Sequence, residues 1–265
     1  METVFWIKLC LGFLAGSVWV TLSTLASEKY GSKIGGLIGG YPSTVVIALL
    51  FIGLTQGRSF AAETTTIMPV AQGLNGLFVI VFMLLAKRGL FQALAGGLLA
   101  WFALALCLVT SGLNNWFVSI IGWILCVCIC FIIVEKKMTI TSCEKIDVQY
   151  TPTRIIWRAL LGGSVIAAAV LLSKLTGPLY GGVLSIFPAV FLSTLTIAYS
   201  SGGTRFARAM GKSMVVSGMI NVALYAILVR YLYVWTNLPI GTGIALIVSC
   251  GSVYLTYLFI RARLS

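Results

Sequence analysis

Two stretches of the chain carry the same pattern of small residues and proline: SEKYGSKIGGLIGGYPSTVV at 27–46 and SKLTGPLYGGVLSIFPAVFL at 173–192. At an offset of 146 residues their glycine pairs and prolines align. The same offset without gaps from residue 12 to residue 97 gives 16 identities in 86 pairs, and half of them are Gly, Pro or Asn. Because aliphatic residues are far more abundant in this chain, composition alone would match leucines more readily. The pattern therefore predicts an internal repeat.

The composition indicates an integral membrane protein. Hydrophobic residues make up 60% of the 265 residues and charged residues only 9%, whereas a soluble domain has about 25% charged residues. A membrane helix needs about 20 apolar residues, and a β-barrel would instead show short strands of alternating polarity. We expect an all-α polytopic membrane protein with about nine transmembrane helices, near 4–26, 34–54, 67–86, 90–110, 116–134, 155–172, 179–200, 214–233 and 240–260.

The repeat divides these helices into two groups of four. We expect a first four-helix repeat at 1–112, a linking transmembrane helix and cytoplasmic loop at 113–152, and a second four-helix repeat at 153–265. Equivalent positions in the two repeats are then separated by five membrane crossings. Because this number is odd, the second repeat is expected to be inverted in the membrane. The arrangement resembles the inverted-topology repeats of secondary transporters, which implies a site near the membrane midplane between the copies.

The basic residues sort strongly between the two sides of this topology. The chain has 18 Lys and Arg against six Asp and Glu, a net charge of +12. Fourteen of the basic residues fall on one side, and the other side holds Lys8, Arg58, Lys174 and Arg230. The positive-inside rule then predicts an outside N-terminus and a cytoplasmic C-terminus in a cell inner or plasma membrane. Orientation and contact with the lipid bilayer account for the charge, so we expect no nucleic-acid partner.

Two proline breaks are the first candidates for a substrate site. Proline inside a helix frees backbone polar groups, and a membrane tolerates them only where they are buried in protein or face a cavity. Paired breaks in two halves favour a transport site, whereas the alternative is a pair of kinks with close packing through Gly-x-x-x-Gly. The predicted substrate-binding residues of the breaks are Tyr41, Pro42, Ser43, Thr44, Phe187 and Pro188.

Three polar residues complete the predicted site. Asn75 and Asn221 occupy the same place in the two copies, and because a lipid-facing amide is costly, both are expected to face the protein interior. They could contact substrate or form interhelical hydrogen bonds. Glu63 is the first candidate for proton coupling. Its alternative is a surface carboxylate at a helix start, paired with Arg58.

The absence of several residue types and motifs restricts the possible classes of function. There is no histidine, and no phosphate-binding or dinucleotide-binding glycine motif. Cys126, Cys128 and Cys130 do not share one helical face, so we predict neither a metal site nor a cofactor, and no enzymatic activity. The sequence favours a secondary transporter that moves a small molecule or an ion by alternating access. The alternatives are a channel, a lipid flippase, or a scaffold or accessory subunit that does not transport, and a homodimer is left open.

Overall fold

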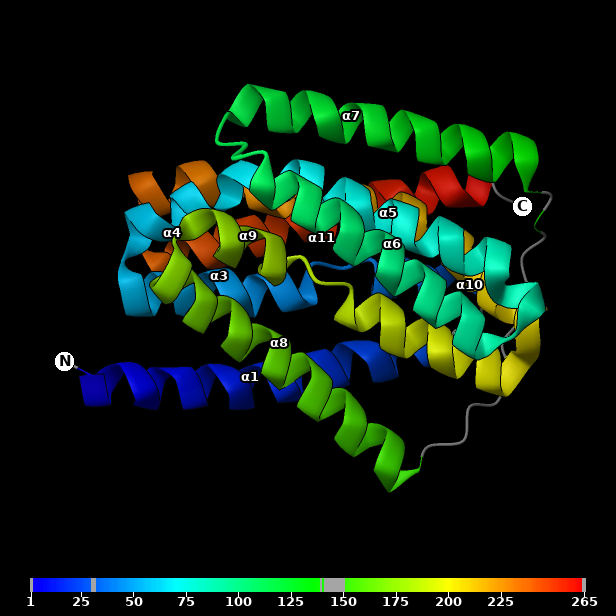
Figure 1. Cartoon of the computed structure of the whole chain (residues 1–265), viewed down its shortest axis with the longest axis horizontal. Helices are drawn as coiled ribbons and strands as arrows, with labels where there is room; N and C mark the ends of the chain where they lie inside the picture. Colours follow the sequence, from blue (N-terminus) through cyan, green and yellow to red (C-terminus); the bar gives the residue numbers. More distant parts are fainter. Residues whose placement is uncertain (1, 30–31, 139, 141–150, 264–265) are drawn as a thin grey trace.

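The computed structural model describes residues 2–29, 32–138, 140 and 151–263, and every regular element in these ranges is a helix. The all-α prediction is therefore confirmed for the described residues, while residues 141–150, most of the predicted cytoplasmic loop, lie outside them. Figure 1 shows the helices packed side by side. Their bounds are α1 (Glu2–Glu28), α2 (Ser32–Gly39), α3 (Ser43–Gln56), α4 (Arg58–Thr64), η1 (Thr65–Ile67), α5 (Met68–Leu85), η2 (Ala86–Arg88), α6 (Leu90–Thr110), α7 (Trp116–Ile132), η3 (Ile133–Lys137), α8 (Pro152–Thr176), α9 (Pro178–Ser185), α10 (Ala189–Trp235) and α11 (Leu238–Arg263).

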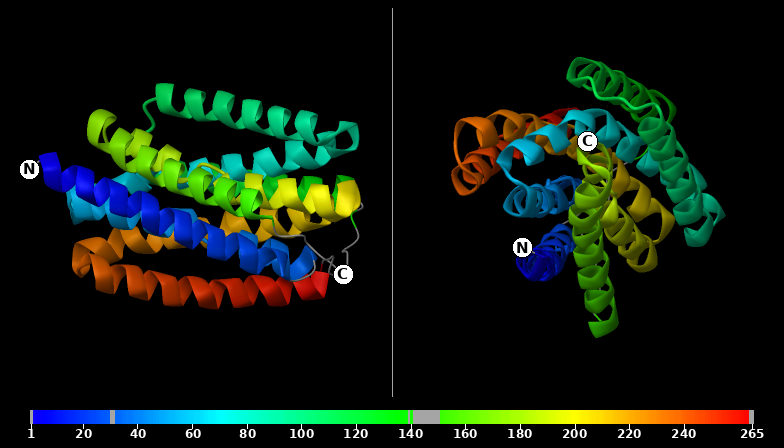
Figure 2. Two further views of the ribbon diagram at one scale, coloured as in Figure 1. Left: turned by 90° about the horizontal axis from the view of Figure 1, so that it is seen from below. Right: turned by 60° about the vertical axis from the view of Figure 1, so that its left-hand side comes forward.

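Eight helical stretches in the described part are long and apolar enough to cross a membrane. The outer helices expose large apolar side chains, such as Phe117 of α7, which is 75% exposed. In water such a surface would be costly, but in lipid it is the expected one. The chain is therefore a helical membrane protein, and the first residues of α1 and the last residues of α11 lie at opposite ends of the bundle (Figure 2).

The longest apolar stretch, Pro178–Trp235, has 58 residues and is interrupted twice. The first interruption separates α9 from α10. The second is inside α10 at Gly203, whose φ of 67° and ψ of −169° are not helical, and there the chain turns back (Figure 1). Glycine adopts this positive φ without the steric cost that a Cβ would add.

Helix boundaries in the two halves differ by the same 146 residues. α2 covers Ser32–Gly39 and α9 covers Pro178–Ser185, while α3 and α10 begin at Ser43 and Ala189. The turn between α3 and α4 is at Gly57, with a φ of 100°, and its counterpart is Gly203. The offset found in the sequence is thus also an offset between structural elements.

The two proline breaks have almost the same backbone conformation. Pro42 has φ −73° and ψ 41°, and Pro188 has φ −76° and ψ 44°. In each break the residue after proline donates its amide to the carbonyl of the residue before it, at 2.7 Å for Ser43 and 2.8 Å for Ala189. This is an inverse γ-turn, which interrupts the helix because proline has no amide hydrogen to donate.

Close contacts at glycine also occur in pairs, and the offset of 146 residues relates the two contacts of each pair. A Cβ on Gly16 of α1 would meet Ile166 of α8, and a Cβ on Gly162 of α8 would meet Val20 of α1. Glycine in these positions allows the helix backbones to approach closely. The reciprocity extends to the broken helices, where a Cβ on Gly36 would meet the carbonyl oxygen of Met210 and a Cβ on Gly182 would meet that of Thr64.

Two helices begin earlier than the hydropathy pattern predicted. The third span was expected from residue 67, but α4 begins at Arg58 and leads through η1 into α5. Likewise, the arm of α10 expected from residue 214 begins directly after Gly203. The charged residues near 58–63 and 205–212 lower local hydropathy without ending the helix, and the positive-φ glycines decide where the chain turns.

The packing of α2 against α10 predicts different effects for two glycine-to-alanine substitutions. Gly36→Ala places a methyl group against the backbone of Met210, and overpacking against atoms that cannot move costs about 1–3 kcal/mol. Gly251→Ala in α11 meets no atom within 4 Å. Thermal unfolding of the purified protein in detergent should show a lower midpoint for Gly36→Ala only. Equal midpoints for the two variants would contradict this packing.

Candidate functional site

The two proline breaks meet at one small cavity. They lie near the middle of the long axis of the bundle (Figure 1). The cavity between them, of about 30 Å³, is lined by the ends of α2 and α9, the starts of α3 and α10, one face of α5, and Val222 in the second arm of α10. A water molecule needs roughly 10–15 Å³ measured in this way. The cavity in this conformation therefore admits only one or two water-sized groups.

Seven of the nine predicted site residues line this cavity. The structure brings together residues of both breaks and one amide of α5, namely Tyr41, Pro42, Ser43, Thr44, Asn75, Phe187 and Pro188. The two others, Asn221 and Glu63, do not line it. The two breaks, which are 146 residues apart, therefore line one cavity. Of the two asparagines at the same offset, only Asn75 lines it.

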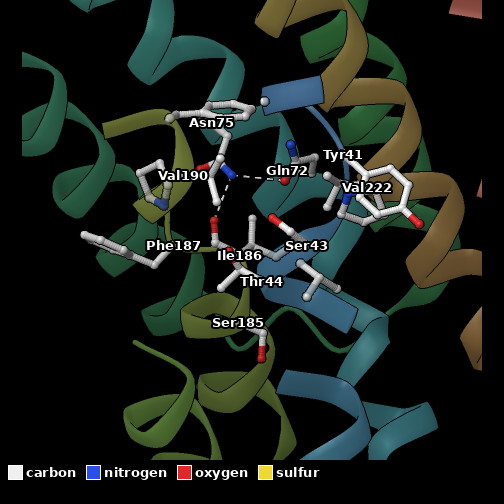
Figure 3. Close-up of a pocket in the computed structure, with 15 residues that line it drawn as sticks. Tyr41, Ser43, Thr44, Gln72, Asn75, Ser185, Ile186, Phe187, Val190 and Val222 are labelled. Atoms are coloured by element: carbon white, nitrogen blue, oxygen red, sulfur yellow. Dashed lines mark hydrogen bonds between the residues drawn. The ribbon is translucent and has the colours of Figure 1, made fainter. Parts of the chain in front are cut away.

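Asn75 connects α5 to the second break. Its Nδ2 donates to the carbonyl of Ile186 at 2.7 Å and to Oε1 of Gln72 at 3.0 Å (Figure 3), and its Oδ1 accepts from the indole nitrogen of Trp101 at 2.8 Å. Asn75 is only 5% exposed. The amide therefore satisfies a carbonyl that the helix break leaves without a helical donor.

Gln72 links the two halves directly. Its Nε2 donates to the carbonyl of Gly218 in α10 at 3.0 Å. Gly218 is the residue that the 146-residue offset pairs with Gln72. Gln72 lines the cavity and was not among the predicted site residues. Its spacing of three from Asn75 places both amides on one helix face, and this signal was available in the sequence.

The aromatic residues of the two breaks point in different directions. Phe187 packs against Trp101 of α6 in an edge-to-face contact with ring centroids 5.2 Å apart. The ring of Tyr41 points away from the cavity (Figure 3) toward α11, where its hydroxyl lies 3.7 Å from Sγ of Cys250. Trp101 was also missed by the sequence prediction, because its role depends on how α6 packs against α9.

The cavity lining contains no charged side chain. Its polar groups are the side chains of Ser43, Thr44, Gln72, Asn75 and Ser185, together with the backbone of the breaks. In the described ranges, no three His, Cys, Asp or Glu side chains lie close enough to hold a metal ion. The site can form hydrogen bonds and offers helix dipoles, but no described side chain in it carries a formal charge.

Asn221 lies in a separate polar cluster between α10 and α11. Its Nδ2 donates to Oγ of Ser217 at 3.0 Å, and its Oδ1 accepts from the hydroxyls of Ser252 and Thr256. It is fully buried, as is nearly all of Asn75. The prediction that both amides face the protein interior is confirmed, and both form the interhelical hydrogen bonds of the alternative interpretation.

Glu63 lies in α4, away from the cavity. It is exposed and lines a surface pocket of about 340 Å³ with Arg230 and Trp235 among its neighbours. Arg58, its expected partner, donates instead to the carbonyl of Thr236 at 2.8 Å. Glu63 is also near the end of α4 rather than at a helix start. This position gives no support to the coupling role, which stays a prediction.

The hydrogen bonds of Asn75 predict a loss of stability when the amide is removed. Asn75→Leu leaves the Ile186 carbonyl and the Trp101 indole without their partners, and each unsatisfied buried group costs about 1–3 kcal/mol. The thermal midpoint in detergent should fall by several degrees. Gln92→Leu, which removes an exposed amide from the first turn of α6, is the control, and a midpoint for Asn75→Leu as high as that of the control would refute the assignment.

Part of the chain is similar to a known family. Residues 9–114 match the model of a family described as "Protein of unknown function (DUF3147)", which covers fewer than half of the residues. The match runs from within α1 to the loop after α6. No curated protein and no solved structure matches the chain.

Proposed function

We propose that the protein is a secondary transporter that moves a small solute by alternating access. The observation that carries this proposal is the cavity at which two helix breaks, one from each half, meet near the middle of the bundle. Broken helices that expose backbone groups at membrane depth are a feature of transport sites. The small volume of the cavity corresponds to a closed state, which must open alternately toward the two ends.

The proposal includes two inverted four-helix repeats and nine crossings. The matching bounds of α2 and α9, the equal geometry of the two breaks and the turn-back at Gly203 support it. The reciprocal contacts of Gly16 and Gly162 agree with a two-fold relation between the halves. The family match ends at residue 114, close to the predicted end of the first repeat at 112, which agrees with the first half being a unit.

The contacts of the basic residues support an outside N-terminus. The four basic residues at the proposed outer end are all held by protein groups: Lys8 by the Leu54 carbonyl, Arg58 by the Thr236 carbonyl, Lys174 by the Phe5 ring and Arg230 by the Thr66 hydroxyl. At the proposed cytoplasmic end, Lys29, Lys87 and Arg88 are exposed, while Lys212 pairs with Glu135 at 3.5 Å. Exposed cations there suit the anionic lipid of a cytoplasmic leaflet.

The glycine contacts suggest how the site could open. α2 packs on α10 through Gly36 and Gly40, and α9 packs on the α4–η1 segment through Gly182. Surfaces without side chains can shift against each other with few interlocking groups to separate. We propose that the two broken helices, α2–α3 and α9–α10, rock in turn while Gln72 and Asn75 hold the centre.

The accessibility of Thr44 tests alternating access before any substrate is known. In a cysteine-free background, Thr44→Cys should react with a membrane-impermeant thiol reagent from either side of sealed vesicles of known orientation, because the cavity opens to each side in turn. Thr110→Cys, at the exposed end of α6, should react from one side only. Reaction of Thr44→Cys from neither side would favour the scaffold alternative.

Flux measurements separate the remaining alternatives. In proteoliposomes, a transporter gives saturable uptake with counterflow, whereas a channel gives flux that does not saturate. Movement of a fluorescent lipid between leaflets would instead identify a flippase. Non-saturating flux or lipid movement, without counterflow of any solute, would overturn the transporter proposal.

The orientation has its own test. A fluorescent protein fused after Ser265 should fluoresce in a bacterial host, and an alkaline phosphatase fused there should be inactive, because the C-terminus is proposed to be cytoplasmic. Fusions in the loop between α6 and α7, near Gly112, provide the opposite control. An active phosphatase at the C-terminus would reverse the orientation.

A further inference from the structure

Four backbone amides at the cavity have no acceptor in the described part of the chain. They are the second and third amides of α3, from Thr44 and Val45, and the second and third of α10, from Val190 and Phe191. The amides before and after each pair are used, since Ser43 and Ala189 donate within the γ-turns and Val46 and Leu192 donate to the prolines. All four residues line the same cavity. Two helix N-termini, one from each half, therefore direct free N–H groups into one space.

A side chain provides a second, independent donor. Ser43 is 1% exposed, and its hydroxyl has no hydrogen-bond partner. Figure 3 shows that the hydroxyl points toward the space beside Asn75 and the Ile186 carbonyl. A buried hydroxyl without a partner is costly, and here a ligand in the cavity could accept its hydrogen.

The negative ends of the neighbouring helices are partly compensated. At the end of α2, the Leu37 carbonyl accepts from the Ser217 hydroxyl and from an amide. At the second break, the Ile186 carbonyl accepts from Asn75. No carboxylate lines the cavity.

Among the described residues, the carbonyl oxygens of Gly39 and Ser185, which also line the cavity, have no donor. They are fewer than the four free amides and the Ser43 hydroxyl, and the dipoles of α3 and α10 present their positive ends, so the site favours an anion over a cation.

We propose that the cavity binds a small anion, held by the N-termini of α3 and α10 and by the Ser43 hydroxyl. This inference rests on the proposed transport function and names its substrate class. Helix N-termini bind anions through free amides and the positive end of the dipole, and broken helices in transporters use them in this way. The volume of about 30 Å³ limits the ligand to a halide or a compact oxyanion that has lost its water.

Binding to purified full-length protein tests the site directly. The thermal midpoint is measured against rising sodium fluoride, chloride, bromide, nitrate and formate, with sodium gluconate keeping the sodium concentration and ionic strength constant. At least one small anion should raise the midpoint saturably. Ser43→Ala should weaken its apparent affinity by about tenfold or more, since hydrogen bonds to charged groups are among the stronger ones.

A matched variant controls for the loss of a buried hydroxyl. Thr194 also has a buried hydroxyl without a partner, but it does not line the cavity, so Thr194→Val should keep the wild-type affinity. If Ser43→Ala binds the anion as tightly as Thr194→Val does, the assigned site is wrong. If the Ser43→Ala protein is unstable, Ser43→Cys serves in its place and should also weaken binding.

Efflux from proteoliposomes separates failure of the inference from failure of the transport function. Anion efflux is followed with ion-selective electrodes, and a panel of labelled cations and neutral solutes is tested in parallel. Saturable efflux of the anion that binds supports the inference. Transport of a cation or a neutral solute without any anion shift overturns the inference and leaves the transporter intact. Absence of any transport, with Thr44→Cys unreactive from both sides, overturns both.

Discussion

The constraint on which the rest of the structure depends is that backbone N–H and C=O groups away from water must find partners. Two helices of this chain are interrupted near the middle of the bundle, where lipid surrounds the protein and cannot supply partners. Pro42 and Pro188 cause the interruptions, and each is closed by a γ-turn that recovers one hydrogen bond. Asn75 then satisfies the Ile186 carbonyl. Among the groups left over are the amides of Thr44, Val45, Val190 and Phe191, residues that line the cavity.

Close packing at glycine makes this burial possible. Gly36, Gly40 and Gly182 allow neighbouring backbone or short side chains to approach the broken helices, and Pro42 and Pro188 are buried. Where Gly16 and Gly162 bring α1 against α8, the contacts are reciprocal. The proposed inverted relation between the halves would produce each of these contacts twice. The same glycines also leave few interlocking side chains to separate when one half moves against the other.

Much of the candidate site could be predicted from the sequence because its parts are local. The proline breaks depend on covalent chemistry, and their repetition at one offset identified both. The burial of Asn75 and Asn221 followed from the cost of an amide in lipid. The helix starts at Arg58 and after Gly203 were missed because hydropathy reports polarity, whereas glycine conformation decides the turn. Trp101 was missed because its partner belongs to another helix. Asn221 was predicted for the site but lies outside the cavity, because equal sequence positions acquired different neighbours.

The proposed mechanism combines two broken helices, a site between them and a motion that exposes the site alternately. Its central claim can be tested by electron–electron distance measurements in lipid nanodiscs with spin labels at two symmetry-related pairs. The first pair is residues 59 and 175, and the second, at the offset of 146, is residues 205 and 29. All four positions are exposed. Alternating access predicts two distances for each pair. When the longer distance of one pair becomes more populated, the longer distance of the other pair should become less populated. A single distance for both pairs, unchanged across added salts and pH, would contradict it.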